Sequence, residues 1–72
     1  MAQSKSPDNI MMEIGDAIRF RRISTETSLQ AAADAIGIRK ATLIDIEHGR
    51  PCELKTLLNV LSHFNGRLKI EW

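Results

Sequence analysis

The chain has 72 residues and a formal net charge of +1, and 43% of its residues are hydrophobic. This length suits one small domain, which buries only about 60% of its unfolded surface and is marginally stable alone. The single cysteine excludes an internal disulfide framework and a cysteine-based zinc site. Oligomerisation is therefore the remaining source of stability, and we expect a homodimer.

The beginning of the chain, MAQSKSPDNIMMEIG, lacks the apolar core of a secretory signal. No run approaches the roughly 20 apolar residues of a membrane span, so we expect a soluble, cytoplasmic protein. Residues 1–7 are polar and indicate a flexible N-terminal arm. The low net charge means that any nucleic-acid affinity must come from the placement of the cations. Six of the ten lie between residues 19 and 50, as Arg19, Arg21, Arg22, Arg39, Lys40 and Arg50.

A first helix is expected after this arm. Asp8 or Asn9 is a suitable N-cap, because a short side-chain acceptor satisfies the free N–H groups of the first turn. The helix should fade through residues 23–27, where β-branched and hydroxyl side chains favour irregular structure. Phe20 lies at the flank of an apolar stripe. The stripe has helical spacing and is predicted to be buried; it consists of Ile10, Met11, Ile14, Ala17 and Ile18.

Two short helices are predicted next. Ser28 is a favourable N-cap for the first, and Gly37 ends it, because glycine adopts left-handed backbone without a steric penalty. The second covers roughly residues 39–48, and Gly49 is its expected C-cap. Two helices joined by a short glycine turn form a helix-turn-helix. At their contact, Ala33 supplies a small side chain and Leu43 an apolar anchor.

A fourth helix is expected from Glu53, since an acidic residue is favourable at a helix N-terminus. Its apolar face has i, i+3, i+4, i+7 spacing and consists of Leu54, Leu57, Leu58, Leu61 and Phe64. Residues 65–66 (Asn-Gly) indicate a turn. In the residues that follow, Leu68, Ile70 and Trp72 alternate with Arg67, Lys69 and Glu71. Strict alternation predicts a strand.

No other segment has a strand pattern, so a strand over residues 67–72 would lack a partner in its own chain. We expect it to pair with the same strand of a second copy, antiparallel across a two-fold axis. The alternative is a disordered tail. Trp72 either packs in this dimer lid or anchors a protein partner.

Several segments carry a family resemblance. IGDAIRFRR, AAADAIGIRKATLIDIEHGR and LLNVLSHF resemble, in order, the successive helices of Xre/Cro-like helix-turn-helix proteins, which include the lambdoid phage repressors. NGRLKIEW is similar to the end of HipB-type antitoxins, whose C-terminal strand pairs across the dimer. The resemblance implies a mainly α, four- to five-helix lambda-repressor-like domain over residues 8–66 and a dimerisation strand over 67–72. It also implies a repressor that neutralises a HipA-like kinase toxin and represses its own operon.

In such proteins the N-terminal turn and one face of the recognition helix enter the major groove. Arg39 and Lys40 occupy that turn and can donate to guanine, and Ala41 can meet a thymine methyl; otherwise the two cations are merely solvated. Ile44 either touches a methyl or faces the partner subunit. Asp45 accepts from a cytosine, is held by a nearby arginine, or excludes wrong sequences; we favour an intramolecular role.

The resemblance implies an ion pair between Arg22 and Glu47 that fixes how the helices dock. Leu29 stands where many relatives carry a DNA-binding glutamine, although the N–H groups of that helix terminus can still bind a phosphate. Phosphate contacts are expected from Ser28, Gln30, Arg22, Arg50 and His48.

No residue pattern predicts catalysis. His48 and His63 have no partner at metal-ligand spacing, Cys52 has no adjacent base, and a glycine-rich phosphate loop is missing from the sequence. We expect no enzymatic activity, metal, cofactor or small-molecule ligand. The expected partners are double-stranded DNA with a palindromic operator, a second copy and a HipA-like kinase toxin. The alternatives are a free-standing phage or mobile-element regulator and a protein-binding adaptor that has lost base reading.

Overall fold

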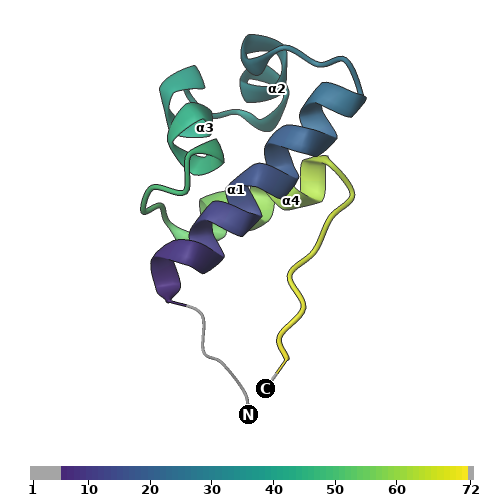
Figure 1. Ribbon diagram of the computed structural model, residues 1–72. Helices are drawn as coiled ribbons and strands as arrows, with labels where there is room; N and C mark the ends of the chain where they lie inside the picture. Colours follow the sequence, from purple (N-terminus) through teal and green to yellow (C-terminus); the bar gives the residue numbers. More distant parts are fainter. Residues whose placement is uncertain (1–5, 72) are drawn as a thin grey trace.

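The computed structural model describes residues 6–71, and over that range the chain is mainly α-helical (Figure 1). The four helices are α1 (Pro7–Ser24), α2 (Leu29–Ile36), α3 (Lys40–Glu47) and α4 (Leu54–His63). None of them has the length and apolar character needed to cross a membrane.

After α4 the chain continues as a tail without helix or strand as far as residue 71. Figure 1 shows this tail leaving the helices toward the same side as the start of α1. Strand pairing between two copies needs a second chain, so the dimerisation strand over residues 67–72 stays a prediction. Trp72 lies outside the described residues, as do residues 1–5 of the expected arm.

The first helix begins earlier than expected. Ser6 is its N-cap, and the Ser6 hydroxyl accepts a hydrogen bond from the Asn9 backbone N–H at 3.2 Å. Pro7 is the first helical residue, a position where its missing N–H costs nothing and its fixed φ suits the helix. The prediction of Asp8 or Asn9 as the cap was wrong, because both lie inside the first turn. Pro7 therefore belongs to α1, whereas the sequence predicts it in the arm.

Local signals define α2 and α3. The Ser28 hydroxyl accepts from the Ala31 N–H at 3.0 Å, which confirms the predicted N-cap of α2. Gly37 has a φ of 90° and ends α2 as predicted. Arg39 is the N-cap residue of α3, and His48 is its C-cap. Gly49, the expected C-cap, comes one residue later with a left-handed φ of 76°.

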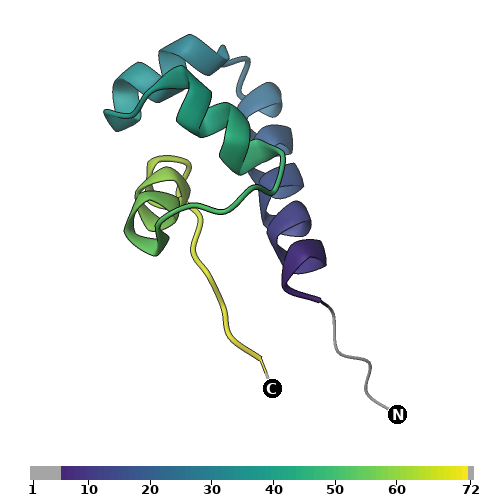
Figure 2. The same ribbon diagram turned by 90° about the vertical axis from the view of Figure 1, so that its left-hand side faces the viewer.

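All four helices contribute to one core. α3 packs against α1 and α2, and α4 packs against α2; Figure 2 shows α2 and α3 side by side with α4 below them. Ala33 and Leu43 are fully buried members of one hydrophobic core, in which α2 packs against α3. The buried hydrophobic residues are Ile18, Ala32, Ala33, Leu43, Ile46, Leu57 and Val60.

The predicted apolar faces were only partly correct. On α4, Leu57 and Val60 are buried, whereas Leu54 and Leu58 are 63% and 40% exposed. On α1, Ile18 is buried, but Ile10 is exposed. Helical periodicity identifies the apolar side of a helix, but burial also requires a neighbouring element over that part of the helix.

An open groove of about 310 Å³ separates part of α1 from the end of α4. Ala17 on α1, Phe64 after α4 and Gly66 in the following turn are among its lining residues. Ala17 is consequently exposed, although the stripe predicted it to be buried. In the single chain this side of α1 lacks a full covering layer.

Candidate nucleic-acid interface

The exposed side of α3 and its flanking turns form the candidate site, which we call the α3 face. The α3 face consists of Arg39, Lys40, Ala41, Ile44, Asp45 and His48. Ile44 and Asp45 are half-buried, and the other four residues are exposed. The structure thus brings all five predicted base-contacting residues, and one predicted phosphate contact, onto one side of the molecule.

The buried side of α3 fixes its orientation through a close approach to α1. A Cβ atom placed on Gly15 would lie 2.6 Å from the backbone oxygens of both Ile46 and Glu47. Only a hydrogen atom fits in this space, so α1 and α3 meet backbone to backbone. The α3 face is therefore held at a defined angle to α1.

An ion pair also connects these elements. Arg22 Nε donates to Glu47 Oε2 at 2.7 Å, and Arg22 Nη2 donates to Glu47 Oε1 at 3.1 Å. The third donor, Arg22 Nη1, reaches the Thr27 carbonyl oxygen at 3.0 Å, so the pair joins α1, the α1–α2 loop and α3. The hydrogen bond with Glu47 raises the pKa of Arg22 against the opposing effect of burial.

This arrangement bears on the two roles expected for Arg22. The ion pair with Glu47 is present, and only 11% of the Arg22 side chain and 4% of the Glu47 side chain are exposed. All three guanidinium nitrogens of Arg22 already donate to protein oxygens. Arg22 therefore acts first as the connection between helices, and little of its surface is left for a phosphate.

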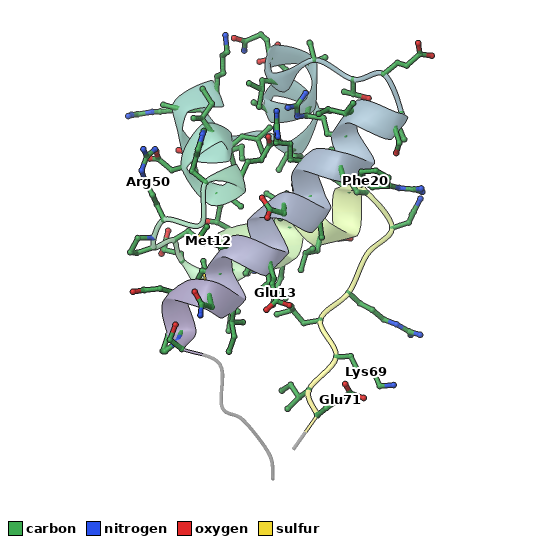
Figure 3. All side chains as sticks on the ribbon, in the orientation of Figure 1. Met12, Glu13, Phe20, Arg50, Lys69 and Glu71 are labelled. Atoms are coloured by element: carbon green, nitrogen blue, oxygen red, sulfur yellow. The ribbon has the colours of Figure 1, made fainter. Side chains whose placement is uncertain are left out.

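A second ion pair lies at the same, C-terminal end of α3 but on its exposed side. Arg50 Nη1 is 2.7 Å from Asp45 Oδ1, and the Arg50 backbone N–H donates to the Asp45 carbonyl oxygen at 2.9 Å. The side chains of Arg50 and Asp45 are 60% and 50% exposed. Asp45 is thus held by an arginine, one of the three roles that its sequence position allowed. Figure 3 shows Arg50 on the α3 side of the molecule, across α1 from the tail residues Lys69 and Glu71.

The charge along α3 is uneven as a result. Within residues 6–71, Arg39 and Lys40 form no ion pair, and the Arg39 side chain makes no capping hydrogen bond. Both cations stand at the positive end of the α3 dipole, where peptide N–H groups also favour anions. Arg50, at the far end, is offset by Asp45. Positive charge on the α3 face is therefore concentrated at its beginning.

The remaining predicted phosphate contacts make local hydrogen bonds. The Ser28 hydroxyl caps α2, Gln30 Nε2 donates to Asp34 Oδ1 at 2.9 Å, and His48 Nδ1 lies 2.8 Å from the Ile44 carbonyl oxygen. Their side chains are exposed at the start of α2 and the end of α3. Leu29, beside Ser28, packs against the core.

Sequence reasoning did not place Met12 and Asp16 of α1 beside the α3 face. An open groove of about 540 Å³ runs between α1 and α3, and Ile44 and His48 line it together with Asp16 and Arg19 of α1. Met12 also lines this groove (Figure 3). The i, i+4, i+7 spacing of Met12, Asp16 and Arg19 was the available signal, because it puts all three on one side of a helix.

The tail lies apart from this face, and all of its described residues, Arg67, Leu68, Lys69, Ile70 and Glu71, are exposed. Lys69 Nζ is 3.8 Å from Glu71 Oε2 (Figure 3). Residues two apart share one side of an extended chain. Leu68 and Ile70 are apolar side chains left in water by the single chain.

No group of three or more His, Cys, Asp or Glu side chains in the described part of the chain is arranged to bind a metal ion. Cys52 is half-buried, and desolvation raises the pKa of its thiol. No protein-family model matches the chain. A comparison with curated proteins likewise gives no match.

Proposed function

We propose that the protein is a sequence-specific DNA-binding repressor. In this proposal α2 and α3 are the helix-turn-helix of a lambda-repressor-like domain, and α3 is the recognition helix. The supporting observation is that Arg39 and Lys40, free of ion pairs among residues 6–71, stand at the exposed beginning of a helix whose other side is locked to α1. Unpaired cations on a helix of fixed orientation are suited to bind duplex DNA, a polyanion with a regular groove.

Binding would place the beginning of α3 in the major groove, which is wide enough for an α-helix. Arg39 and Lys40 would donate to guanine O6 and N7, and Ala41 would contact a thymine methyl group. Around this centre, Ser28 and His48 would contact phosphate oxygens. Each phosphate neutralised makes the logarithm of affinity fall more steeply with salt, by a slope of about 0.9.

We further propose that the protein acts in the cytoplasm as a homodimer on a palindromic operator. Exposed apolar side chains on α4 and the tail support a second copy, because Leu54, Leu58, Leu68 and Ile70 remain in water in the single chain. Pairing of residues 67–72 between copies would cover part of this surface. Two α3 helices would then read half-sites about 34 Å apart.

The most specific form of the proposal is an antitoxin that binds a HipA-like kinase and represses the operon encoding both proteins. It rests on the resemblance of NGRLKIEW to the end of HipB-type antitoxins. An adjacent kinase gene and co-purification of its product with this protein would support it. A free-standing phage or mobile-element regulator would have neither.

A DNA-binding titration tests the central claim. Fluorescence anisotropy would compare a duplex from upstream of the coding sequence with a random duplex, between about 50 and 200 mM salt. The double variant R39E/K40E should lose at least about 10-fold in affinity. K55E is the matched control, because Lys55 is exposed on α4, away from the α3 face.

No preference of the wild-type protein for the upstream duplex would contradict sequence-specific binding. If the wild-type protein bound no DNA while a protein partner bound R39E/K40E normally, the adaptor function would be correct instead.

A further inference from the structure

The pair formed by Asp45 and Arg50 lies on the surface proposed to read DNA. Asp45 follows Ala41 by four residues, so the two share one side of α3 about one turn apart. Arg50 reaches back from the turn after α3 and contacts Asp45 twice, through its backbone N–H and through its guanidinium. The left-handed backbone of Gly49 turns the chain so that the Arg50 N–H reaches the Asp45 carbonyl oxygen, and this hydrogen bond keeps Arg50 beside Asp45. The Asp45 carboxylate therefore has a fixed neighbour rather than a chance one.

Only one carboxylate oxygen of Asp45 is engaged. Oδ1 accepts from Arg50, whereas Oδ2 has no hydrogen-bond partner among residues 6–71. An ionised carboxylate can accept hydrogen bonds but cannot donate them. Half of the Asp45 side chain is exposed, so Oδ2 can accept a hydrogen bond from a donor of another molecule.

The neighbouring guanidinium makes a carboxylate tolerable near DNA. An isolated Asp45 would be repelled by phosphates, whereas the pair with Arg50 is close to neutral. The main contribution of the pair is therefore not affinity but selection, because repulsive or unpaired groups discriminate between partners even when they add no attraction.

We propose that Asp45 is a specificity-determining residue that selects a cytosine in each half-site, with Arg50 as its positioning residue. This inference rests on the proposed DNA-binding function. In the major groove only cytosine N4 and adenine N6 donate hydrogen bonds. Adenine also presents its N7 acceptor beside that donor, which repels a carboxylate, whereas the cytosine edge presents only the donor. Guanine and thymine offer acceptors, so the carboxylate excludes them.

Selection of bound duplexes from a randomised pool, followed by sequencing, tests this directly. The wild-type protein should show a cytosine preference at one position of each half-site. In D45A this cytosine preference should fall by roughly 5- to 100-fold, the range for one good base contact. The preferences at other positions should be unchanged. D8A is the matched control, because Asp8 is an exposed carboxylate in the first turn of α1 and forms no ion pair among residues 6–71.

Two more variants separate reading from structural damage. D45N keeps an acceptor and gains a donor, the pattern that pairs with adenine N7 and N6, so the preference should change from cytosine to adenine. R50A should weaken the cytosine preference while the rest of the motif survives. A change of base identity at one position is not a result that loss of folding produces.

Other results would overturn the inference. If D45A bound all sequences more tightly, with unchanged preferences and a steeper salt dependence, Asp45 would only withhold Arg50 from phosphates. Unchanged base preferences in both D45A and D45N would also exclude reading by Asp45, although the DNA-binding function would stand. Absence of DNA binding by the wild-type protein would overturn both proposals together, so the two failures are distinguishable.

Discussion

Gly15 of α1 lies against the backbone of Glu47 at the end of α3, so close that a Cβ atom on Gly15 would be 2.6 Å from the Glu47 carbonyl oxygen. Glu47 also holds Arg22, a later residue of α1, through two hydrogen bonds. The same residue of α3 thus contacts α1 by backbone proximity at one point and by an ion pair at another. Together the two contacts fix the orientation of α3 relative to α1.

The substitution G15A should destabilise the protein. Alanine is normally preferred over glycine inside a helix by about 1 kcal/mol, so an open site would give a gain. Here the added methyl group meets two backbone oxygens that cannot move without separating α1 from α3. We expect a net loss of about 1–3 kcal/mol in the free energy of unfolding, measured by urea denaturation.

G37A is the control for this experiment. Gly37 has a φ of 90°, but nothing lies within 4 Å of an added Cβ. Its cost should come from backbone strain alone, about 1–2 kcal/mol. G15A should in addition disturb the packing of α3 and weaken DNA binding. A stable G15A protein with unchanged binding would show that the two helices are not in backbone contact.

Removing one partner of the Arg22–Glu47 pair should be costly. The substitution E47A leaves a largely buried guanidinium without its carboxylate. Such losses amount to about 3–5 kcal/mol for fully buried pairs, which sets the upper range expected here. The double variant R22M/E47L should recover part of this loss, because it leaves no buried charge unpaired. A double-mutant cycle in urea measures the coupling, and near-additivity of the two single effects would contradict the pairing.

The Asp45–Arg50 pair should contribute much less to stability than the Arg22–Glu47 pair, although the shortest N–O distance is 2.7 Å in both. Both side chains are at least half exposed, and water screens the interaction. We expect D45A to change the free energy of unfolding by less than about 1 kcal/mol, and raising the salt concentration should remove most of that effect. A loss as large as that of E47A would mean that Asp45 has a structural role beyond this pair.

The Cys52 thiol should make stability depend on pH in alkaline solution. Burial raises the pKa of this thiol in the folded state, so the folded chain keeps its proton at a pH where the unfolded chain releases it. The contribution is fully present below the ordinary thiol pKa of about 8.5 and is lost as the pH rises through the higher folded value. C52A should flatten this part of the stability profile.

Thiol alkylation gives a second measurement of the same property. At a pH near the ordinary thiol pKa, folded protein should react more slowly than urea-unfolded protein, because the thiolate is the reactive form. Equal rates would show that Cys52 is not desolvated.

The exposed apolar residues of the tail lead to a prediction about the oligomeric state. Ile70 is one of the most exposed large apolar residues of the described chain, and pairing of residues 67–72 between two copies would bury it. I70D should convert the expected dimer into monomer in light scattering, whereas R39E/K40E, on the α3 face, should not. A monomeric wild-type protein would contradict the proposed assembly.

The sequence by itself determined the features that depend on neighbours along the chain. The Ser28 cap, the left-handed Gly37 and the apolar side of α4 follow from hydrogen-bonding groups and spacing within a few residues. The early cap at Ser6 was missed because Ser6, Asp8 and Asn9 are all suitable acceptors. Local propensity alone does not rank such competing caps.

Only the tertiary structure decided which apolar and charged side chains have neighbours. Leu54 and Leu58 belong to the apolar side of α4 but remain exposed, because burial depends on the elements opposite them. Likewise, the resemblance implied the Arg22–Glu47 pair, but the sequence left the role of Asp45 open. The turn at Gly49 brings Arg50 back to Asp45. The reason is that burial and ion pairing are set by distances through space, which periodicity along one helix does not encode.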